Sequence, residues 1–107
     1  MKIQVKPFSV NQAWQGKRFR SDAYKQFQQD MMLMLPPLKI AFKKHLKVDL
    51  VFGFSSKAAD IDNPIKPLLD ILQKKYGFND NQIYEMNVVK EITKKSEEFI
   101  QLQIHEI

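Results

Sequence analysis

Hydrophobic and polar residues repeat with two different periods in the first half of the chain, and each period predicts one type of element. A two-residue period predicts a strand over Met1–Lys6, which Pro7 ends or places at a sheet edge. Apolar residues three and four positions apart predict a helix over Ser21–Leu35, with Pro36 as its stop. The strict alternation of Leu46–Phe54 predicts a strand with one buried face.

The second half repeats the same two periods in the order helix, strand, strand. A helix is predicted from Pro64 or Pro67 to about Tyr76, and a glycine follows it as a natural stop. Alternating residues predict strands over Ile83–Thr93 and Phe99–Ile107, which we expect to form a hairpin around a polar turn. The predicted order is therefore β-α-β-α-β-β. It is typical of an α+β domain with two helices on one face of a mixed sheet.

Length and composition fit one small domain over residues 1–107. A chain of 12.6 kDa buries about two-thirds of its unfolded surface, which is enough for one core. The chain has no cysteine, which excludes disulfides, thiol catalysis and cysteine-type zinc sites. No apolar run is long enough for a membrane span, and the first 14 residues lack the apolar stretch of a signal peptide. We therefore expect a cytoplasmic protein that does not bind membranes.

Charge is unevenly distributed between the two halves. Residues 1–54 contain ten Lys and Arg against three acidic residues, whereas residues 55–107 contain seven Lys against nine acidic residues. A basic half is suited to a polyanion such as nucleic acid, and gathered carboxylates are suited to cations. An ordinary solvated surface would give the same totals, so charge alone does not decide the function.

Acidic residues gather in one segment together with a lysine. Asp60 and Asp62 lie two residues apart, so an extended backbone would direct both carboxylates to one side. Such a pair is tolerated beside a cation, and Mg²⁺ prefers oxygen ligands of this kind. Lys66 lies one helical turn before Asp70, which could hold its side chain, and Asp80 follows from a separate turn. Taken singly, the same residues would also serve as helix caps and turns.

Two other Asp-x-Asp sites do not fit the segment. A calcium-binding EF-hand loop that starts at Asp60 would need Gly and Glu where the chain has Ile65 and Ile71. An aspartyl-phosphate phosphatase would place the motif directly after a buried strand, but the polar run Ser55–Ala59 comes first.

The segment DIDNPIKPLLDIL, followed by NDNQI, has a more specific pattern. It resembles the signature of the RusA family of Holliday junction resolvases, Asp-x-Asp-Asn-x-x-Lys-x-x-x-Asp-x-Leu with a later Asp-x-Gln. The matching residues are Asp60, Asp62, Asn63, Lys66, Asp70, Leu72, Asp80 and Gln82. The opening PFSVN, which ends at Asn11, and the later Trp14 and Tyr24 are similar to the family's N-terminal segment. Lys90 resembles a lysine that is common after the acidic turn.

The resemblance implies a small homodimeric endonuclease that uses Mg²⁺, or Mn²⁺ as a substitute, to cut four-way DNA junctions in recombination and repair. It makes Asp60, Asp62 and Asp80 metal ligands and Lys66 the basic residue near the scissile phosphate. Asp70 and Asn63 would orient these catalytic side chains without binding the metal themselves.

Three positions depart from the family pattern. Asn79 replaces an acidic residue, which removes a negative charge near the metal. Ala59 stands where some relatives have an aromatic residue, and Pro67 is an unusual neighbour of Lys66. These departures put metal affinity and junction distortion by an aromatic wedge in question.

Two basic stretches are candidates for DNA contact. Cations and an aromatic side chain occur together around a predicted loop, as phosphate contact and base stacking require. The candidate DNA-binding residues are Asn11, Trp14, Lys17, Arg18 and Arg20. A second stretch contains Lys39, Lys43, Lys44 and Lys47. Both stretches would also fit a solvated surface.

Two other functions remain open at the level of sequence. A non-catalytic basic nucleic-acid-binding module would explain the basic half and would leave the aspartates as caps and turns. A basic domain that binds an acidic protein would need no nucleic acid. His45 and His105 have no partner at a metal-binding spacing, so we expect ordinary surface or strand residues. The end of the first helix, Met31–Met34, has more apolar positions than one face can bury, so core and interface are both open.

Overall fold

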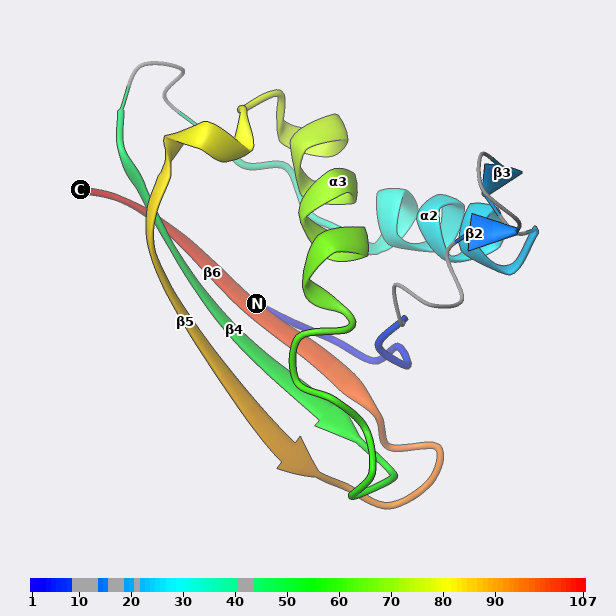
Figure 1. Ribbon diagram of the computed structural model, residues 1–107. Helices are drawn as coiled ribbons and strands as arrows, with labels where there is room; N and C mark the ends of the chain where they lie inside the picture. Colours follow the sequence, from blue (N-terminus) through cyan, green and yellow to red (C-terminus); the bar gives the residue numbers. More distant parts are fainter. Residues whose placement is uncertain (9–13, 16–18, 21, 41–43) are drawn as a thin grey trace.

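The computed structural model describes residues 1–8, 14–15, 19–20, 22–40 and 44–107, and in these residues two helices cover a four-stranded mixed sheet (Figure 1). The elements in chain order are β1 (Lys2–Ile3), β2 (Trp14–Gln15), β3 (Phe19–Arg20), α2 (Asp22–Met34), β4 (Leu46–Phe54), α3 (Ile65–Tyr76), the 3-10 helix η1 (Asp80–Gln82), β5 (Ile83–Ile92) and β6 (Phe99–Glu106). The α+β class and the predicted order are confirmed, with the short β2–β3 pair added. Among the described residues, no helix is both long and apolar enough to cross a membrane.

The strand order β1-β6-β4-β5 places β4 at the centre of the sheet. β5 runs parallel to β4 and β6 runs antiparallel to it, so β5 and β6 lie on opposite sides of β4. The expectation that the last two strands form a hairpin with each other is therefore wrong. β4 has one buried apolar face and can pair along both of its edges, so β5 and β6 both pair with β4.

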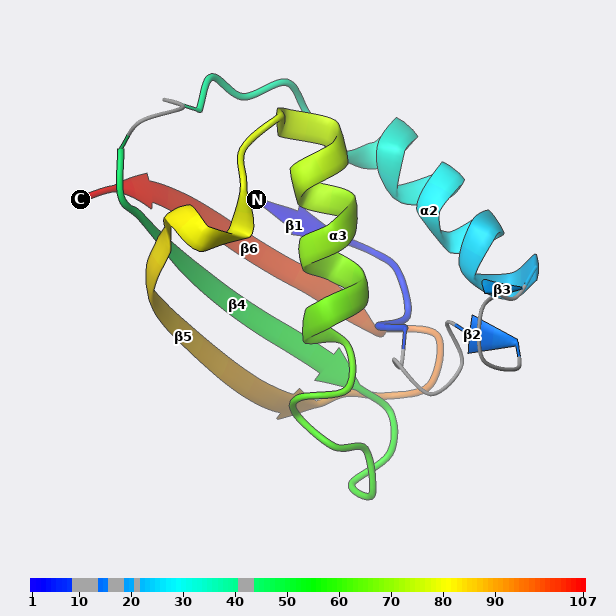
Figure 2. The same cartoon turned by 45° about the horizontal axis from the view of Figure 1, so that its top comes forward.

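Both helices lie on one face of the sheet (Figure 2), as the sequence predicts. The even-numbered residues of β4 point toward α3 and are at most 9% exposed, which confirms the two-residue period. They form one core with the buried face of α3, with α2 and with β6; its largest fully buried side chains are Tyr24, Phe52, Met31, Leu46, Leu50, Leu68, Ile71, Leu72, Ile100, Leu102 and Val48.

Proline and glycine set the ends of α3. Pro64 is the N-cap, and Pro67 lies in the first turn, where a missing N–H costs no helical hydrogen bond. Asn63, a residue type that often caps helices, lies directly before Pro64 but is not the N-cap. Gly77 ends the helix with a left-handed φ of 78° and donates its N–H to the carbonyl of Gln73.

Side chains at the end of α3 fix α2 against it. The Lys75 ammonium donates to the Met32 carbonyl at 2.9 Å, and the Tyr76 hydroxyl donates to the Pro36 carbonyl at 2.7 Å. Of the apolar cluster at the end of α2, Met31 is completely buried, whereas Leu33 is 86% exposed. The cluster therefore divides between core and surface.

The first strand and the basic loop differ from their predictions. β1 covers only Lys2–Ile3, because the chain bends at Val5 before Pro7. The segment expected to be a loop contains the antiparallel pair β2–β3, in which Trp14 is opposite Arg20. Ser21, where the predicted helix begins, lies outside the described residues.

The sheet face away from the helices carries polar contacts. His105 Nε2 and Asn87 Nδ2 each lie 3.1 Å from the carboxylate of Asp49, across the strands that flank β4. His45 stacks on Tyr84 with ring centroids 3.8 Å apart. Both histidines therefore have specific partners that sequence spacing did not indicate.

Candidate active site

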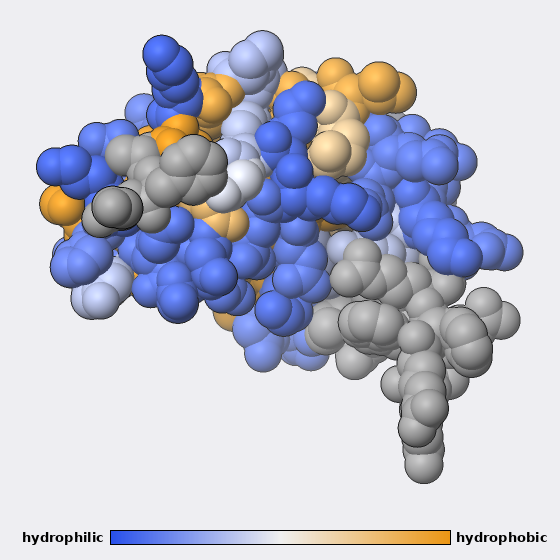
Figure 3. All heavy atoms as spheres, turned by 90° about the horizontal axis from the view of Figure 1, so that it is seen from above, coloured by the Kyte–Doolittle hydropathy of each residue, from blue (hydrophilic) through white to orange (hydrophobic). Residues whose placement is uncertain are grey.

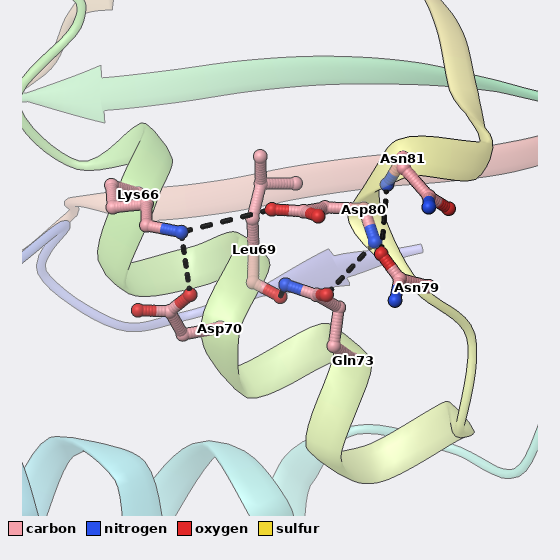
Figure 4. A network of polar contacts seen from close by, with 7 residues as sticks. All are labelled: Lys66, Leu69, Asp70, Gln73, Asn79, Asp80 and Asn81. Carbon is pink, nitrogen blue, oxygen red and sulfur yellow. Dashed lines mark hydrogen bonds and ion pairs between the residues drawn. The ribbon is translucent and has the colours of Figure 1, made fainter.

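The Lys66 ammonium lies between two carboxylates (Figure 4). Its Nζ is 3.1 Å from Asp70 Oδ1, one helical turn along α3, and 3.7 Å from Asp80 Oδ2 of η1. The side chains of Lys66 and Asp80 are 61% and 44% exposed, so solvent and substrate can reach both. The structure therefore brings together three of the residues that the sequence motif singled out, from two different elements.

Lys66 is a strong cation in this arrangement. Hydrogen bonding and charge attraction from Asp70, with a smaller contribution from Asp80, raise the pKa of Lys66 above the ordinary lysine value. The ammonium is consequently protonated at neutral pH. It can place a positive charge beside a phosphate, but it cannot act there as a general base.

η1 holds Asp80 in place by local capping. The Asn79 side chain accepts from the N–H of Asn81, and the Gln82 side chain accepts from the N–H of Asn79. Gln82 also donates to the Lys44 carbonyl, which ties the turn to the segment before β4. Asn79, a departure from the family pattern, therefore has a structural function as a cap.

Gln73 connects η1 to α3. Its Oε1 accepts from the main-chain N–H of Asp80 at 2.8 Å, and its Nε2 donates to the Leu69 carbonyl at 3.1 Å. Gln73 is not part of the sequence motif, although its position on the helix could have indicated it. Lys66, Asp70 and Gln73 follow one another at spacings of four and three and so share one face of α3.

Asp60 and Asp62 lie in consecutive turns and not in an extended segment. The Asn63 N–H donates to the Asp60 carbonyl, and the Ile65 N–H donates to the Asp62 carbonyl. The expectation that an extended backbone directs both carboxylates to one side is therefore wrong, because the chain already turns toward α3 here. Both residues are exposed, and the Asn63 side chain donates to Asp60 Oδ2 at 3.3 Å.

A surface pocket of about 310 Å³ opens beside Asp60. Its lining is mainly apolar, with one lysine and one carboxylate, and comprises Lys6, Pro7, Phe54, Ala58, Ala59, Asp60, Asn63 and Pro64. The half-buried Ala59 is one of the small side chains that line this pocket. The Asp60 carboxylate therefore borders a space that is open to a ligand.

The acidic side chains fit a magnesium ion by their chemistry. They offer carboxylate oxygens that solvent can reach, and Mg²⁺ commonly uses only one or two carboxylates beside waters and a substrate phosphate. Within the described part of the chain, no three acidic or histidine side chains are grouped so that they could hold a metal on their own. Asp60, Asp62 and Asp80 thus form no closed metal cage.

The predicted DNA-binding residues fall mostly outside the described structure. Asn11, Lys17 and Arg18 lie outside the described residues. The backbones of Trp14 and Arg20 belong to β2 and β3. In the second basic stretch, Lys47 pairs with Glu85 at 3.4 Å, Lys39 and Lys44 are exposed, and Lys43 lies outside the described residues.

Comparison with known protein families identifies a family for this chain. The family model described as endodeoxyribonuclease RusA matches residues 4–103, which cover β4, α3, η1 and β5 and all the residues of the acidic motif. No curated protein matches the chain.

Proposed function

The chain belongs to the RusA family of endodeoxyribonucleases, Holliday junction resolvases that act on branched DNA, and we propose that it resolves four-way junctions by Mg²⁺-dependent hydrolysis in recombination and repair. The family match over residues 4–103 carries this proposal. The exposed Lys66–Asp80 pair, placed by two separate elements, supports it.

Asp60, Asp62 and Asp80 are the residues we assign to the metal. Magnesium, or manganese in its place, would supply a more acidic water and a positive charge on the phosphate oxygens. The chain's own contribution is placement. Asn63 orients the carboxylate of Asp60, and Gln73 fixes the backbone of Asp80.

Lys66 is the cation that we place beside the scissile phosphate. Negative charge increases on the phosphate oxygens in the transition state, and a fixed ammonium stabilises it there. Asp70 holds this ammonium from the neighbouring helical turn, at the shorter of its two ion-pair distances. We therefore assign to Asp70 the role of positioning Lys66.

The basic N-terminal half is the part of the chain that we assign to DNA backbone contact. Binding should weaken as salt increases, because each neutralised phosphate releases counterions. Replacing Lys17, Arg18 and Arg20 by Ala should lower junction affinity and reduce the salt slope by about three phosphate contacts. An unchanged slope in a fluorescence anisotropy titration would exclude these residues from the DNA contact.

A homodimer would make the two symmetric cuts that resolution requires. Figure 3 shows one predominantly hydrophilic face of the molecule, with smaller hydrophobic areas. The exposed apolar residues Leu33, Met34 and Leu38, at and just after the end of α2, are our candidate dimer contact. Sedimentation should give a dimer for the wild type and a monomer for Leu33→Glu. A monomeric wild type under cleavage conditions would contradict the dimer proposal.

The direct test of the site is Asp62→Asn, which keeps the shape of the side chain and removes its charge. Cleavage of a four-way junction should fall by roughly a hundredfold or more, while junction binding changes by less than about twofold. Asp30→Asn, an exposed carboxylate on α2, is the matched control and should cleave normally. Equal loss of binding and cleavage in Asp62→Asn would contradict its role as a metal ligand. A wild type that binds junctions but cuts none with Mg²⁺ or Mn²⁺ would instead be a non-catalytic binding module.

A further inference from the structure

A lysine on β5 holds the loop that leads to Asp60. Lys90 Nζ donates to the carbonyl of Lys57 at 2.9 Å and also to the carbonyl of Ala59, the residue directly before Asp60. Lys90 is opposite Phe52 in the parallel β4–β5 pair, so its side chain extends on the helix-covered face of the sheet. Its ammonium lies 5.9 Å from the centre of the Phe54 ring at the end of β4.

The other hydrogen bonds that the structure describes for residues 56–59, directly before Asp60, lie within their own turn. The Ala59 N–H donates to the Ser56 carbonyl, and the Ala58 N–H donates to the Ser56 hydroxyl, which close a tight turn. Beyond Asp60, the Asn63 contacts begin the turns that lead into α3. Lys90 therefore fixes the chain between two turns, immediately before the first candidate ligand.

The choice of partner matters for the charge of the site. An ammonium that bound the carboxylates would neutralise them and would compete with a metal ion. Lys90 binds two main-chain oxygens, so it orders the loop and leaves the Asp60 and Asp62 carboxylates accessible. Groups behind a metal ligand that fix its orientation typically change metal affinity by 10–100-fold when they are removed.

We propose that Lys90 is a positioning residue that holds the Asp60–Asp62 turn in a metal-binding conformation through the carbonyls of Lys57 and Ala59. This inference rests on the proposed function, because it assigns Asp60 and Asp62 to the metal. If Lys90 acted only through its positive charge, its removal would have the opposite effect on metal affinity. Removing a cation near a metal site should increase metal affinity, whereas losing the turn should decrease it.

The test measures Mn²⁺ binding to the DNA-free protein by electron paramagnetic resonance. The variants are Lys90→Met, Lys90→Arg and the control Lys95→Met. Lys95→Met removes the same charge from an exposed position. Lys90→Met should bind Mn²⁺ at least about tenfold more weakly. Lys90→Arg, which keeps the charge and the donors, should recover most of the affinity, and the control should bind as the wild type does. Junction binding without metal should be the same in all variants.

The outcomes separate this inference from the proposed function. If Lys90→Met binds Mn²⁺ as well as the wild type or better, while Asp60→Asn binds it more weakly, the positioning role of Lys90 is wrong and the site assignment stands. If Asp60→Asn leaves Mn²⁺ binding unchanged, the proposed metal site itself is wrong. Should Lys90→Met fail to fold by circular dichroism, Lys90→Gln provides the same comparison. It keeps one donor group and should give an intermediate affinity, and wild-type affinity in this variant would overturn the inference.

Discussion

Lys66 and a divalent cation compete for Asp80, so Lys66→Met should increase metal affinity while it lowers cleavage. The Lys66 ammonium already lies 3.7 Å from Asp80 Oδ2, at a carboxylate that we assign to the metal. A metal ion that approaches Asp80 must overcome that attraction and repel the ammonium. The variant removes the competing charge and keeps a side chain of similar length.

The size of the effect follows from the distance and the exposure of the pair. With side chains 61% and 44% exposed, the pair lies in a dielectric close to that of water. Charge attraction across this distance is then about 1 kcal/mol, the upper end of what surface ion pairs contribute. This energy corresponds to roughly fivefold tighter Mn²⁺ binding in Lys66→Met.

The assay is a titration of the DNA-free protein with Mn²⁺, with Lys74→Met as the control. Lys74 is an exposed lysine on the same helix, two turns beyond Lys66, so its replacement changes the net charge equally. The control should change Mn²⁺ affinity by less than about twofold, because surface charges at longer distances are screened. Equal or weaker Mn²⁺ binding by Lys66→Met would refute the competition argument, whatever happens to cleavage.

Three further predictions concern the stability of the fold and the support of the site. Gly53→Ala should lower the free energy of unfolding by about 2 kcal/mol in urea titration, because a Cβ there would overlap the buried ring of Phe99; wild-type stability would show that the ring can move. The hydrogen bond from Asn87 lowers the pKa of Asp49, and smaller contributions from His105 and Lys47 lower it further. The ionised Asp49 carboxylate therefore stabilises the fold above about pH 4, and this stabilisation is lost as the pH falls further. Asp49→Asn should therefore be less stable than the wild type at pH 7, and thermal melts should show the difference shrinking below pH 4; a difference independent of pH would contradict this. Gln73→Leu should lose about 1 kcal/mol of stability by the same urea titration and weaken Mn²⁺ binding, because Asp80 loses its connection to α3; unchanged Mn²⁺ affinity would separate Gln73 from the site.

Local periodicity predicted those elements that bury one side against a single core. β4 has the predicted bounds, because its alternating residues face a core on one side only. Gly77 ends α3 as expected, because glycine has no Cβ and adopts the left-handed conformation there without strain. The motif also predicted the contact between Lys66 and Asp70, since residues four apart in a helix must be neighbours.

Contacts between distant segments were beyond such patterns. The sequence suggested that β5 and β6 pair with each other, but strand alternation does not specify the partner, and both pair with β4. The turn at Asp60 is closed by a hydrogen bond from the Asn63 N–H to the Asp60 carbonyl, which residue alternation does not indicate. The contacts of Gln73 with Asp80 and of Lys90 with Ala59 join residues from different elements, and no spacing rule connects them.

Cleavage of a labelled synthetic four-way junction, with Mg²⁺ and with EDTA, beside a linear duplex of the same sequence, tests the central claim most directly. We predict paired nicks at symmetric positions on opposite strands, confined to the junction and abolished by EDTA. Tight junction binding with no cleavage in Mg²⁺ or Mn²⁺, or equal cutting of the linear duplex, would contradict the proposed metal-dependent junction resolvase.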